Sequence, residues 1–523
     1  MDLYFNGFID SDISQATAMA VADGKISAIG NDIEILALEK PGCNKHNLGG
    51  KTVWPGLIDS HIHFDMYSQS LSQVKCETRT IEECLERVNS KTKTSQPGEW
   101  VTGQGWNQNT WGKFGTAVQL DSVSRGCPVF LSDKSIHAAW VNSAAMAVAG
   151  LNKNTPDPDG GEIQRDQDGN PTGILFENAV NLVEKLIPPV DNKKRLEYMH
   201  QGQQSLHRFG LTGIHDFDRM ECFFALQELH KSGELTLRVT KGIPVDQLDH
   251  AVSLGLQSGF GDLHLHLGSV KLFADGALGP QTAAMLQPYE GTTDKYGTLL
   301  MSADDVFETG MKATSHGWGM AIHAIGDKAT NEVLNGLAMV RQFEISNDIP
   351  QKLHRIEHLQ LLHPDNFSKA KDVGVVASMQ PIHILSDMDT ADKHWGKRSR
   401  GAYAFASLIN SGTLVIFGSD APVESPNPFL GIGAAVTRSR VADPSRINGW
   451  YPAEKLSISQ ARKAYSQIPA LVSGHEDIFG SLNIGMAADF IILSSDPGKI
   501  EDIEIYEILP EMVFIDGNCV FAK

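Results

Sequence analysis

The strongest constraint on the fold is a series of apolar, strand-like runs separated by helical stretches through the middle of the chain. Polar residues follow the ends of these runs. Near-continuous apolar runs are typical of parallel strands that are buried on both faces. Eight strand–helix units predict an α/β chain built on a closed (β/α)8 TIM barrel. The runs lie around residues 53–60, 211–215, 235–241, 268–273, 319–323, 353–358, 373–379 and 414–419.

The two ends of the chain follow a different pattern, in which apolar and polar positions alternate. Residues 18–21 and 25–29 flank a turn at Asp23-Gly24, and residues 488–493 and 512–515 form a similar β-like pair. Alternation around such turns predicts short antiparallel strands. We expect the two termini to build one small composite β-sandwich domain.

The spacing of the runs predicts an insertion after the first barrel strand. One unit takes roughly 30 residues, since eight units occupy about 250, and the gap between the first two runs is far larger. We place the insertion at about residues 66–200 and expect it to cap the barrel mouth. The predicted domains are 1–53 for the first sandwich part, 54–455 for the barrel, and 456–523 for a C-terminal helix and the second sandwich part.

Histidines two positions apart follow the first run. His61 and His63 project to the same face of an extended strand, so both imidazoles can reach one cation, and imidazole suits zinc, iron and nickel. Two core histidines would give the same spacing. A second pair, His264 and His266, lies before the C-terminal end of its strand, and we interpret it, like His215, as structural.

Three more polar residues end later runs. His323 and His358 end the fifth and sixth runs, and Asp420 follows the eighth. Side chains at the carboxyl ends of barrel strands converge on one site. Asp420 could ligate a metal and accept a proton from metal-activated water. A helix N-cap is the alternative role for this residue, and the two roles are compatible.

Lys271, at the end of the fourth run, is the least obvious member of this group. A divalent cation would repel an ammonium group. The position makes chemical sense if the amine has taken up CO2 to form a carbamate that bridges two metals. The alternative is a buried lysine paired with a carboxylate such as Asp275.

Four further residues are candidates for contact with a substrate. His383, just past the seventh run, could act in catalysis by donating a hydrogen bond to a substrate carbonyl, or it could be structural. His137 and Trp106 in the insertion could shape a substrate site or pack the insertion. Glu177 could point into the pocket or begin a helix.

The order of these motifs resembles that of the binuclear amidohydrolases. Residues 55–63, 270–279, 323–327 and 418–422 are similar to the amidohydrolase-3, or YtcJ-like, branch, which includes N-substituted formamide deformylases. The similarity runs over nearly the whole chain. One departure is Pro280-Gln281, where the branch often has Ser-Arg, and it puts a substrate-side cation in question.

The resemblance implies a ligand set and a reaction. It assigns His61, His63 and Asp420 to one metal, His323 and His358 to another, and Lys271 as a carbamate bridge. It implies hydrolysis of a carbon–nitrogen bond, in an amide, formamide or cyclic amide, by metal-activated water, with one or two ions and zinc as the leading candidate. Ester or phosphoester hydrolysis, metal-assisted isomerisation and a non-catalytic metal-binding role stay open, because a fold and ligand set do not separate them.

Composition argues against two classes of partner, and the resemblance implies a small-molecule substrate. The net charge of -19 argues against nucleic acid and anionic membrane surfaces, which need basic patches. No apolar run approaches the roughly 18 to 20 residues that span a bilayer, and the N-terminus lacks signal-peptide features. Six scattered cysteines without a CxxC pair fit a reducing compartment. We therefore expect a cytoplasmic protein and leave a homodimer open.

Overall fold

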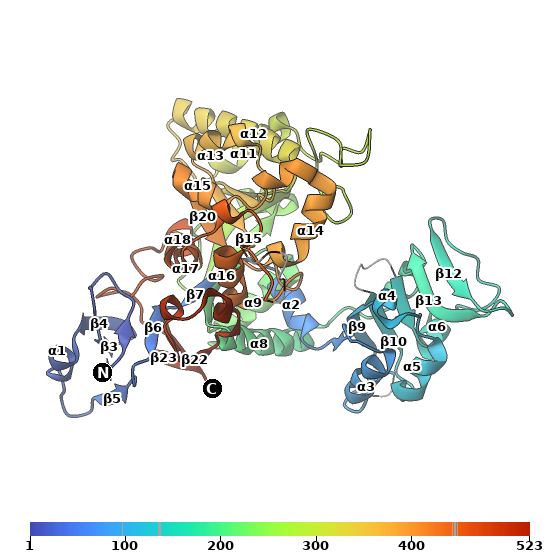
Figure 1. The fold of residues 1–523 in the computed structure, drawn as a ribbon, viewed down its shortest axis with the longest axis horizontal. Coiled ribbons are helices and arrows are strands. Elements are labelled where there is room, and N and C mark those ends of the chain that lie inside the picture. Colours follow the sequence, from blue (N-terminus) through green and yellow to red (C-terminus); the bar gives the residue numbers. More distant parts are fainter. Residues whose placement is uncertain (97, 134–137, 442, 444–445, 447) are drawn as a thin grey trace. The chain divides into compact units, whose positions relative to one another are not determined.

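The structure is a computed structural model that describes residues 1–523 except residues 97, 134–137, 442, 444–445 and 447. Eight parallel strands form one sheet in which neighbours follow the order of the chain (Figure 1). This confirms the predicted barrel. The strands are β7 (Leu57–Ile62), β14 (Leu211–Asp216), β15 (Arg238–Pro244), β16 (Leu265–Phe273), β17 (Met320–Ala324), β18 (Arg355–His358), β19 (Val376–Met379) and β20 (Leu414–Phe417).

Most residues of the barrel strands are buried because both faces of the sheet are covered. Every residue of β7, β14, β18 and β19 is buried, as expected for strands of a parallel barrel. Helices connect successive strands on the outside. The main ones are α8 (Asn192–Arg208), α9 (Met220–Ser232), α10 (Leu248–Ser253), α11 (Ala303–Ser315), α12 (Asp327–Ser346), α13 (Phe367–Val373), α14 (His383–Trp395), α15 (Phe405–Ser411), α16 (Pro428–Thr437), α17 (Ile458–Ala464) and α18 (Gln467–Val472).

The seam of the barrel lies where its last strand returns to its first. The N–H of Asp420 donates to the carbonyl of His61 at 2.7 Å, and the N–H of His63 donates to the carbonyl of Ala421 at 2.9 Å. The buried carboxylate of Asp59, on β7, also accepts a hydrogen bond from the backbone N–H of Ser419 at 3.0 Å. The hydrogen bonds that join β7 to the segment after β20 thus involve the predicted metal ligands themselves.

A composite β-sandwich is formed by the two ends of the chain. One sheet has the order β4-β3-β1-β5, and the other, β2-β6-β21-β22-β23, combines strands from both termini. Phe490 and Phe514 stack at 4.3 Å between ring centroids in the core they share with Met19. The strands are β1 (Asp2–Phe5), β2 (Phe8–Ile9), β3 (Ala18–Ala22), β4 (Lys25–Gly30), β5 (Asn44–Asn47), β6 (Thr52–Pro55), β21 (Phe490–Leu493), β22 (Pro510–Ile515) and β23 (Asn518–Ala522).

The first predicted run, residues 53–60, is two strands rather than one. Thr52–Pro55 forms β6, which pairs with β21 in the sandwich, and β7 begins the barrel at Leu57. The predicted domain boundary after residue 53 therefore falls inside β6. Gly56 separates the two strands, and a Cβ atom there would lie 2.3 Å from Oγ1 of Thr212. Only glycine fits this crossing point between the two domains.

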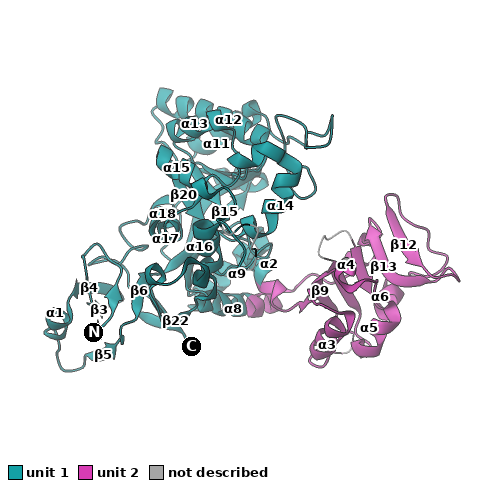
Figure 2. Cartoon of the chain, viewed as in Figure 1, with its two compact units in different colours: residues 1–67, 199–523 teal, residues 68–198 magenta. Residues whose placement is uncertain are grey.

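Residues 68–198 form a second compact unit (Figure 2). Its sheet has the order β12-β13-β11-β10-β9-β8. Trp106, Trp140 and Ile174 are among the fully buried residues of its core. Its elements include β8 (Val74–Lys75), β9 (Val101–Trp106), β10 (Val129–Asp133), β11 (Ala138–Val141), β12 (Gly161–Arg165), β13 (Pro171–Glu177), α3 (Ile81–Thr92), α5 (Ala117–Ser124) and α6 (Ser143–Val148).

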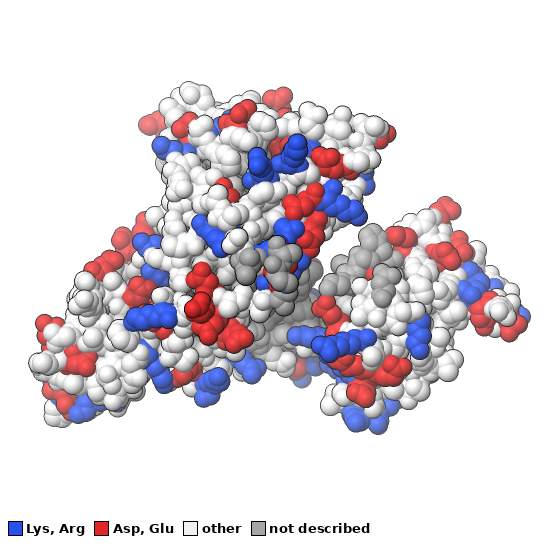
Figure 3. Space-filling model, viewed as in Figure 1, with Lys and Arg blue, Asp and Glu red and all other residues white. Residues whose placement is uncertain are grey.

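The surface carries charges of both signs. On the face seen in Figure 3, Lys and Arg side chains are interspersed with Asp and Glu. Among the described helices, none combines the length and the apolar character needed to cross a membrane.

Candidate metal centre

Three potential ligands meet at the barrel seam. Nε2 of His61 lies 3.6 Å and Nε2 of His63 lies 3.4 Å from Oδ1 of Asp420. One ligand atom from each of the three residues lies within 4.8 Å of the others. Since zinc binds nitrogen and oxygen ligands at about 2.0 to 2.2 Å, atoms at this mutual spacing can share one cation. The structure thus brings together residues from the first and last barrel strands.

Two further histidines lie beside this group. The rings of His323, on β17, and His358, at the end of β18, have centroids 4.5 Å apart, and the His358 ring lies 4.9 Å from that of His61. His358 and Asp420 both have positive φ angles, 70° and 59°. Non-glycine residues in this region are strained and cluster at functional sites. The first, fifth, sixth and eighth strands therefore contribute to one site.

Carboxylates hold the two histidines of the first strand. Nδ1 of His61 donates to Oε2 of Glu357 at 2.5 Å. Nδ1 of His63 lies 3.3 Å from Oδ1 of Asp218, whose Oδ2 accepts the backbone N–H of Asp65 at 2.6 Å. In both rings Nδ1 faces a carboxylate, which leaves Nε2 to face Asp420. Metal-ligating histidines are typically oriented by such partners.

Neutral acceptors hold the other two rings. Nδ1 of His358 donates to Oε1 of Gln380 at 2.8 Å, so Nε2 carries the lone pair. Nε2 of His323 donates to the backbone carbonyl of Gly276 at 3.0 Å, so Nδ1 carries the lone pair. In each of the four histidines one ring nitrogen is held by a protein partner, which leaves the other available as a ligand when it is unprotonated.

The protonation states favour ligand behaviour for three of the histidines. Burial lowers the pKa of His61 and of His323 to about 4, and the nearby Lys271 adds to the shift. Burial also holds the pKa of His358 well below its ordinary value. These rings are neutral at pH 7, as metal ligation requires. For His63, hydrogen bonds to Asp218 and Asp420 outweigh the effect of burial and raise the pKa to about 10.

Asp420 is ionised in this site. Burial raises its pKa, but the nearby rings of His383 and His63 and the other histidines outweigh burial and hold the pKa well below its ordinary value. Nε2 of His383 lies 3.7 Å from Oδ2 of Asp420. His383 begins α14 and its side chain is buried. The structure therefore brings His383 to the same site as the predicted ligands.

Lys271, on β16, is buried in the interior of the barrel. Its Nζ is 5.0 Å and 5.1 Å from the ring centroids of Phe217 and Phe273. Burial lowers the pKa of this amine to about 8. The alternative partner, Asp275, instead accepts the backbone N–H groups of Ile325 and Gly326 at 3.0 and 2.8 Å. The position combines burial with an amine that is readily deprotonated.

The predicted substrate residues of the insertion belong to the second unit. Trp106 is fully buried there, and its indole N–H donates to the carbonyl of Leu131 at 2.7 Å. Glu177 is exposed at the end of β13 and has a φ of 48°. His137 lies outside the described residues. A substrate role for these three stays a prediction.

The residues that hold the ligands were missed at the sequence level. They are Glu357, Asp218 and Gln380, and behind Asp218 lies Asp216, which accepts from the fully buried Lys241 at 2.7 Å. A signal was available, because each of the carboxylates and the amide ends a barrel strand or follows one closely. The sequence alone gave no indication of which ring each one contacts.

An eight-stranded barrel with histidines and an aspartate gathered at the carboxyl ends of its strands is the architecture of a metal-dependent hydrolase. The model of the amidohydrolase family matches residues 46–521, and the chain belongs to this family. The match confirms the resemblance seen in the sequence motifs.

Curated relatives and solved structures agree with this assignment. The chain is 30% identical to the putative amidohydrolase YtcJ of Bacillus subtilis (strain 168), over 100% of this chain and 99% of that one. It is 32% identical to the Protein LONG AFTER FAR-RED 3 of Arabidopsis thaliana, over 94% and 87%. It is 27% identical to an N-substituted formamide deformylase of Arthrobacter pascens, over 97% and 95%. An uncharacterized metal-dependent hydrolase from Pyrococcus furiosus superimposes with a TM-score of 0.77 at 29% identity, over 95% and 100%.

Proposed function

We propose that this hydrolase cleaves a carbon–nitrogen bond of a small molecule, in an amide, a formamide or a cyclic amide. The observation that carries the proposal is the set of four histidines, each held by a protein partner at one ring nitrogen, around an ionised Asp420. The similarity to an N-substituted formamide deformylase supports the choice of bond.

The donor set fits one or two divalent cations, zinc first among them. His61, His63 and Asp420 would hold one cation, and His323 and His358 would hold the other. A carbamate on Lys271 would bridge them. The low pKa of Lys271, about 8, supports this, because only the neutral amine reacts with CO2. The chemistry that such a cation supplies when bound is activation of water and polarisation of a carbonyl group.

The protein's own groups would handle the protons. Asp420, ionised at neutral pH, would take a proton from the attacking water and deliver it to the leaving nitrogen. His383 would donate from Nε2 to the oxyanion that develops on the substrate carbonyl. The pKa of His383 supports this, since Asp420 outweighs the effect of burial and raises that pKa above its ordinary value.

A substrate panel tests the proposal. The purified protein is analysed for metal content and assayed against N-substituted formamides, linear and cyclic amides, carboxylic esters and phosphoesters. We expect turnover of at least one carbon–nitrogen substrate, its loss on chelation and its recovery with zinc. Turnover confined to esters or phosphoesters would contradict the proposed bond. Bound metal with no turnover of any class would favour a non-catalytic protein.

A further inference from the structure

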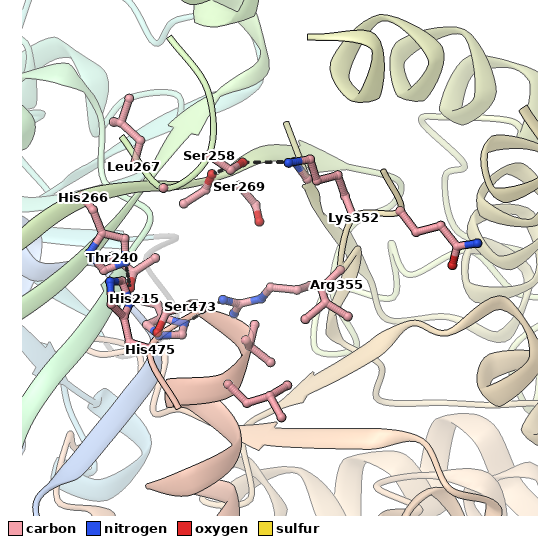
Figure 4. A pocket seen from close by; sticks show the side chains of 18 residues that line it. His215, Thr240, Ser258, His266, Leu267, Ser269, Lys352, Arg355, Ser473 and His475 are labelled. Atoms are coloured by element: carbon pink, nitrogen blue, oxygen red, sulfur yellow. Dashed lines mark hydrogen bonds between the residues drawn. The ribbon is translucent and has the colours of Figure 1, made fainter. Parts of the chain in front are cut away.

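A second polar pocket lies at the opposite end of the barrel strands from the metal centre (Figure 4). Its volume is about 400 Å³. His266 is the second residue of β16, Gly319 precedes β17, and Arg355 is the first residue of β18. The segment after α18 closes one side with His475. Because Arg355 and His358 stand at opposite ends of β18, the pocket and the metal centre are separated by about 10 Å of strand.

Every ionisable side chain among the described residues that line this pocket is basic. They include no aspartate or glutamate among the described lining residues, although the chain has a net charge of -19. Figure 4 shows His215, His266 and His475 gathered on one side, with Arg355 reaching toward them from the other. The basic or potentially basic lining residues are His215, His266, Lys352, Arg355 and His475.

Two of these histidines have unused polar atoms inside the protein. The rings of His266 and His475 lie 4.6 Å apart, and the Nδ1 atom of each is buried without a hydrogen bond of ordinary geometry to a described residue. His266 is only 3% exposed, and its Nε2 lies 3.0 Å from Oγ1 of Thr240. A buried polar atom without a partner costs about 1 to 3 kcal/mol. In the tautomer in which Nδ1 carries the proton, each of these N–H groups is a donor without an acceptor among the described residues.

The two cationic side chains are arranged differently. Arg355 donates from Nε to Oε1 of Glu357 at 2.8 Å and from Nη1 to Nδ1 of His215 at 2.8 Å, so it is fixed in place while lining the pocket. Lys352 is half-buried, and among the described residues its Nζ has no carboxylate within 4.0 Å. An anion would supply the missing counter-charge for Lys352.

We propose that this pocket binds a small oxyanion, with a phosphate group as the best match, at a site distinct from the metal centre. Lysine, imidazole N–H and hydroxyl donors converge from several sides, which suits a tetrahedral group with acceptors in all directions. The volume falls in the range of small-molecule sites, so the group comes either as free phosphate or as part of a small phosphate monoester. The second His-x-His motif then contributes to a ligand site through His266 rather than only to packing.

Calorimetric titration of the holoenzyme with inorganic phosphate tests the site. We expect saturable binding that weakens at least about tenfold in the double variant Lys352→Gln, His475→Gln, because two donors to the anion are lost. The matched control is Lys231→Gln, an exposed lysine at the end of α9, which should bind like the wild type. Circular dichroism checks that every variant is folded.

A second variant separates this pocket from the metal centre, where phosphate could also bind. His63→Asn removes a metal ligand and should leave phosphate affinity unchanged. Loss of binding in His63→Asn with normal binding in the double variant would overturn the proposal, as would the absence of saturable binding to the wild type up to about 10 mM, a concentration well above the Kd range expected for a specific site. A comparison with glycerol phosphate tells the two sources apart: tighter binding of the ester indicates a phosphorylated metabolite, and equal binding indicates free phosphate.

Discussion

Nδ1 of His61 donates to Oε2 of Glu357 across the barrel, from the first strand to the sixth, at 2.5 Å. Arg355 holds the other oxygen of this carboxylate at 2.8 Å. Burial raises the pKa of Glu357, but the charge of Arg355 and the contact with His61 outweigh burial and keep the pKa well below its ordinary value. Glu357 is therefore a fixed anion that sets the tautomer of a metal ligand.

Replacing Glu357 with glutamine should weaken metal binding. The amide has the shape of the carboxylate but not its charge, so we expect metal affinity to fall by about 10- to 100-fold. Competition with a chromogenic chelator measures this. Glu308→Gln, on the exposed face of α11, is the matched control. Unchanged metal affinity in Glu357→Gln would show that the carboxylate does not support the ligand.

Replacing Asp420 with asparagine should separate chemistry from metal binding. We expect turnover to fall by about 10²- to 10⁴-fold, because the amide cannot take up a proton. Metal content should stay largely intact, since the four histidines remain. Steady-state kinetics and metal analysis on the same preparation measure both. Undiminished turnover would remove Asp420 from the mechanism.

Incubation with ¹³C-labelled bicarbonate should introduce one ¹³C-labelled carbamate, on Lys271. We expect one carbamate resonance in the ¹³C NMR spectrum, absent from the Lys271→Arg variant, whose guanidinium stays protonated. The pKa of Lys271 is lowered to about 8, so its reactive neutral form increases as pH rises through 8. Labelling should therefore be faster at pH 8.5 than at pH 6.5. A wild-type spectrum without this resonance rules out the bridge.

His207 should make the stability of the protein fall in acid. Its ring is buried, with Nδ1 donating to the Leu211 carbonyl at 2.9 Å and Nε2 accepting from the Thr236 hydroxyl at 2.7 Å, and burial lowers its pKa to about 4. The unfolded chain, with a pKa near 6.5, binds more protons between these values, so this contribution to stability is lost as pH falls through that window. From pH 7 to pH 5 it amounts to about 2 kcal/mol.

Denaturant titrations of the wild type and of His207→Gln at pH 7 and pH 5 measure the contribution of His207 to this loss of stability. The variant keeps hydrogen-bonding capacity but cannot titrate, so its unfolding free energy should fall by about 2 kcal/mol less than that of the wild type. Equal pH dependence in the two proteins would show that His207 does not contribute to the acid sensitivity.

Much of the barrel and of its ligand set could be predicted from the sequence, and the reasons are physical. Strands buried on both faces leave apolar runs, and residues at their carboxyl ends must meet, so His61 and His323 could be grouped without coordinates. The residues that hydrogen-bond to these imidazole rings could not be predicted from the sequence. Gln380 and Asp218 are ordinary polar residues until the barrel closes and brings each one to a particular imidazole.

Three other features could not be recognised in the sequence: the break between β6 and β7, the buried position of Trp106 and the basic pocket. The break at Gly56 is a single residue between two apolar strands, so β6 and β7 read as one run. Trp106 occupies the core of the second unit, where an aromatic residue that packs cannot be told in sequence from one that binds. The basic pocket is made of residues from four barrel strands, α18 and the loops beside them, and their spacing forms no motif.

Because the barrel seam joins residues that are far apart in the sequence, the order of synthesis determines when the site can form. His61 leaves the ribosome 359 positions (420 minus 61) before Asp420, its neighbour in the folded protein. A nascent chain that stops anywhere in between carries histidines that lack their acidic counterpart and a barrel with an open side. The predicted ligand set is therefore complete only after the eighth barrel strand has emerged, and a cation held by both residues would link the first strand of the barrel to the last.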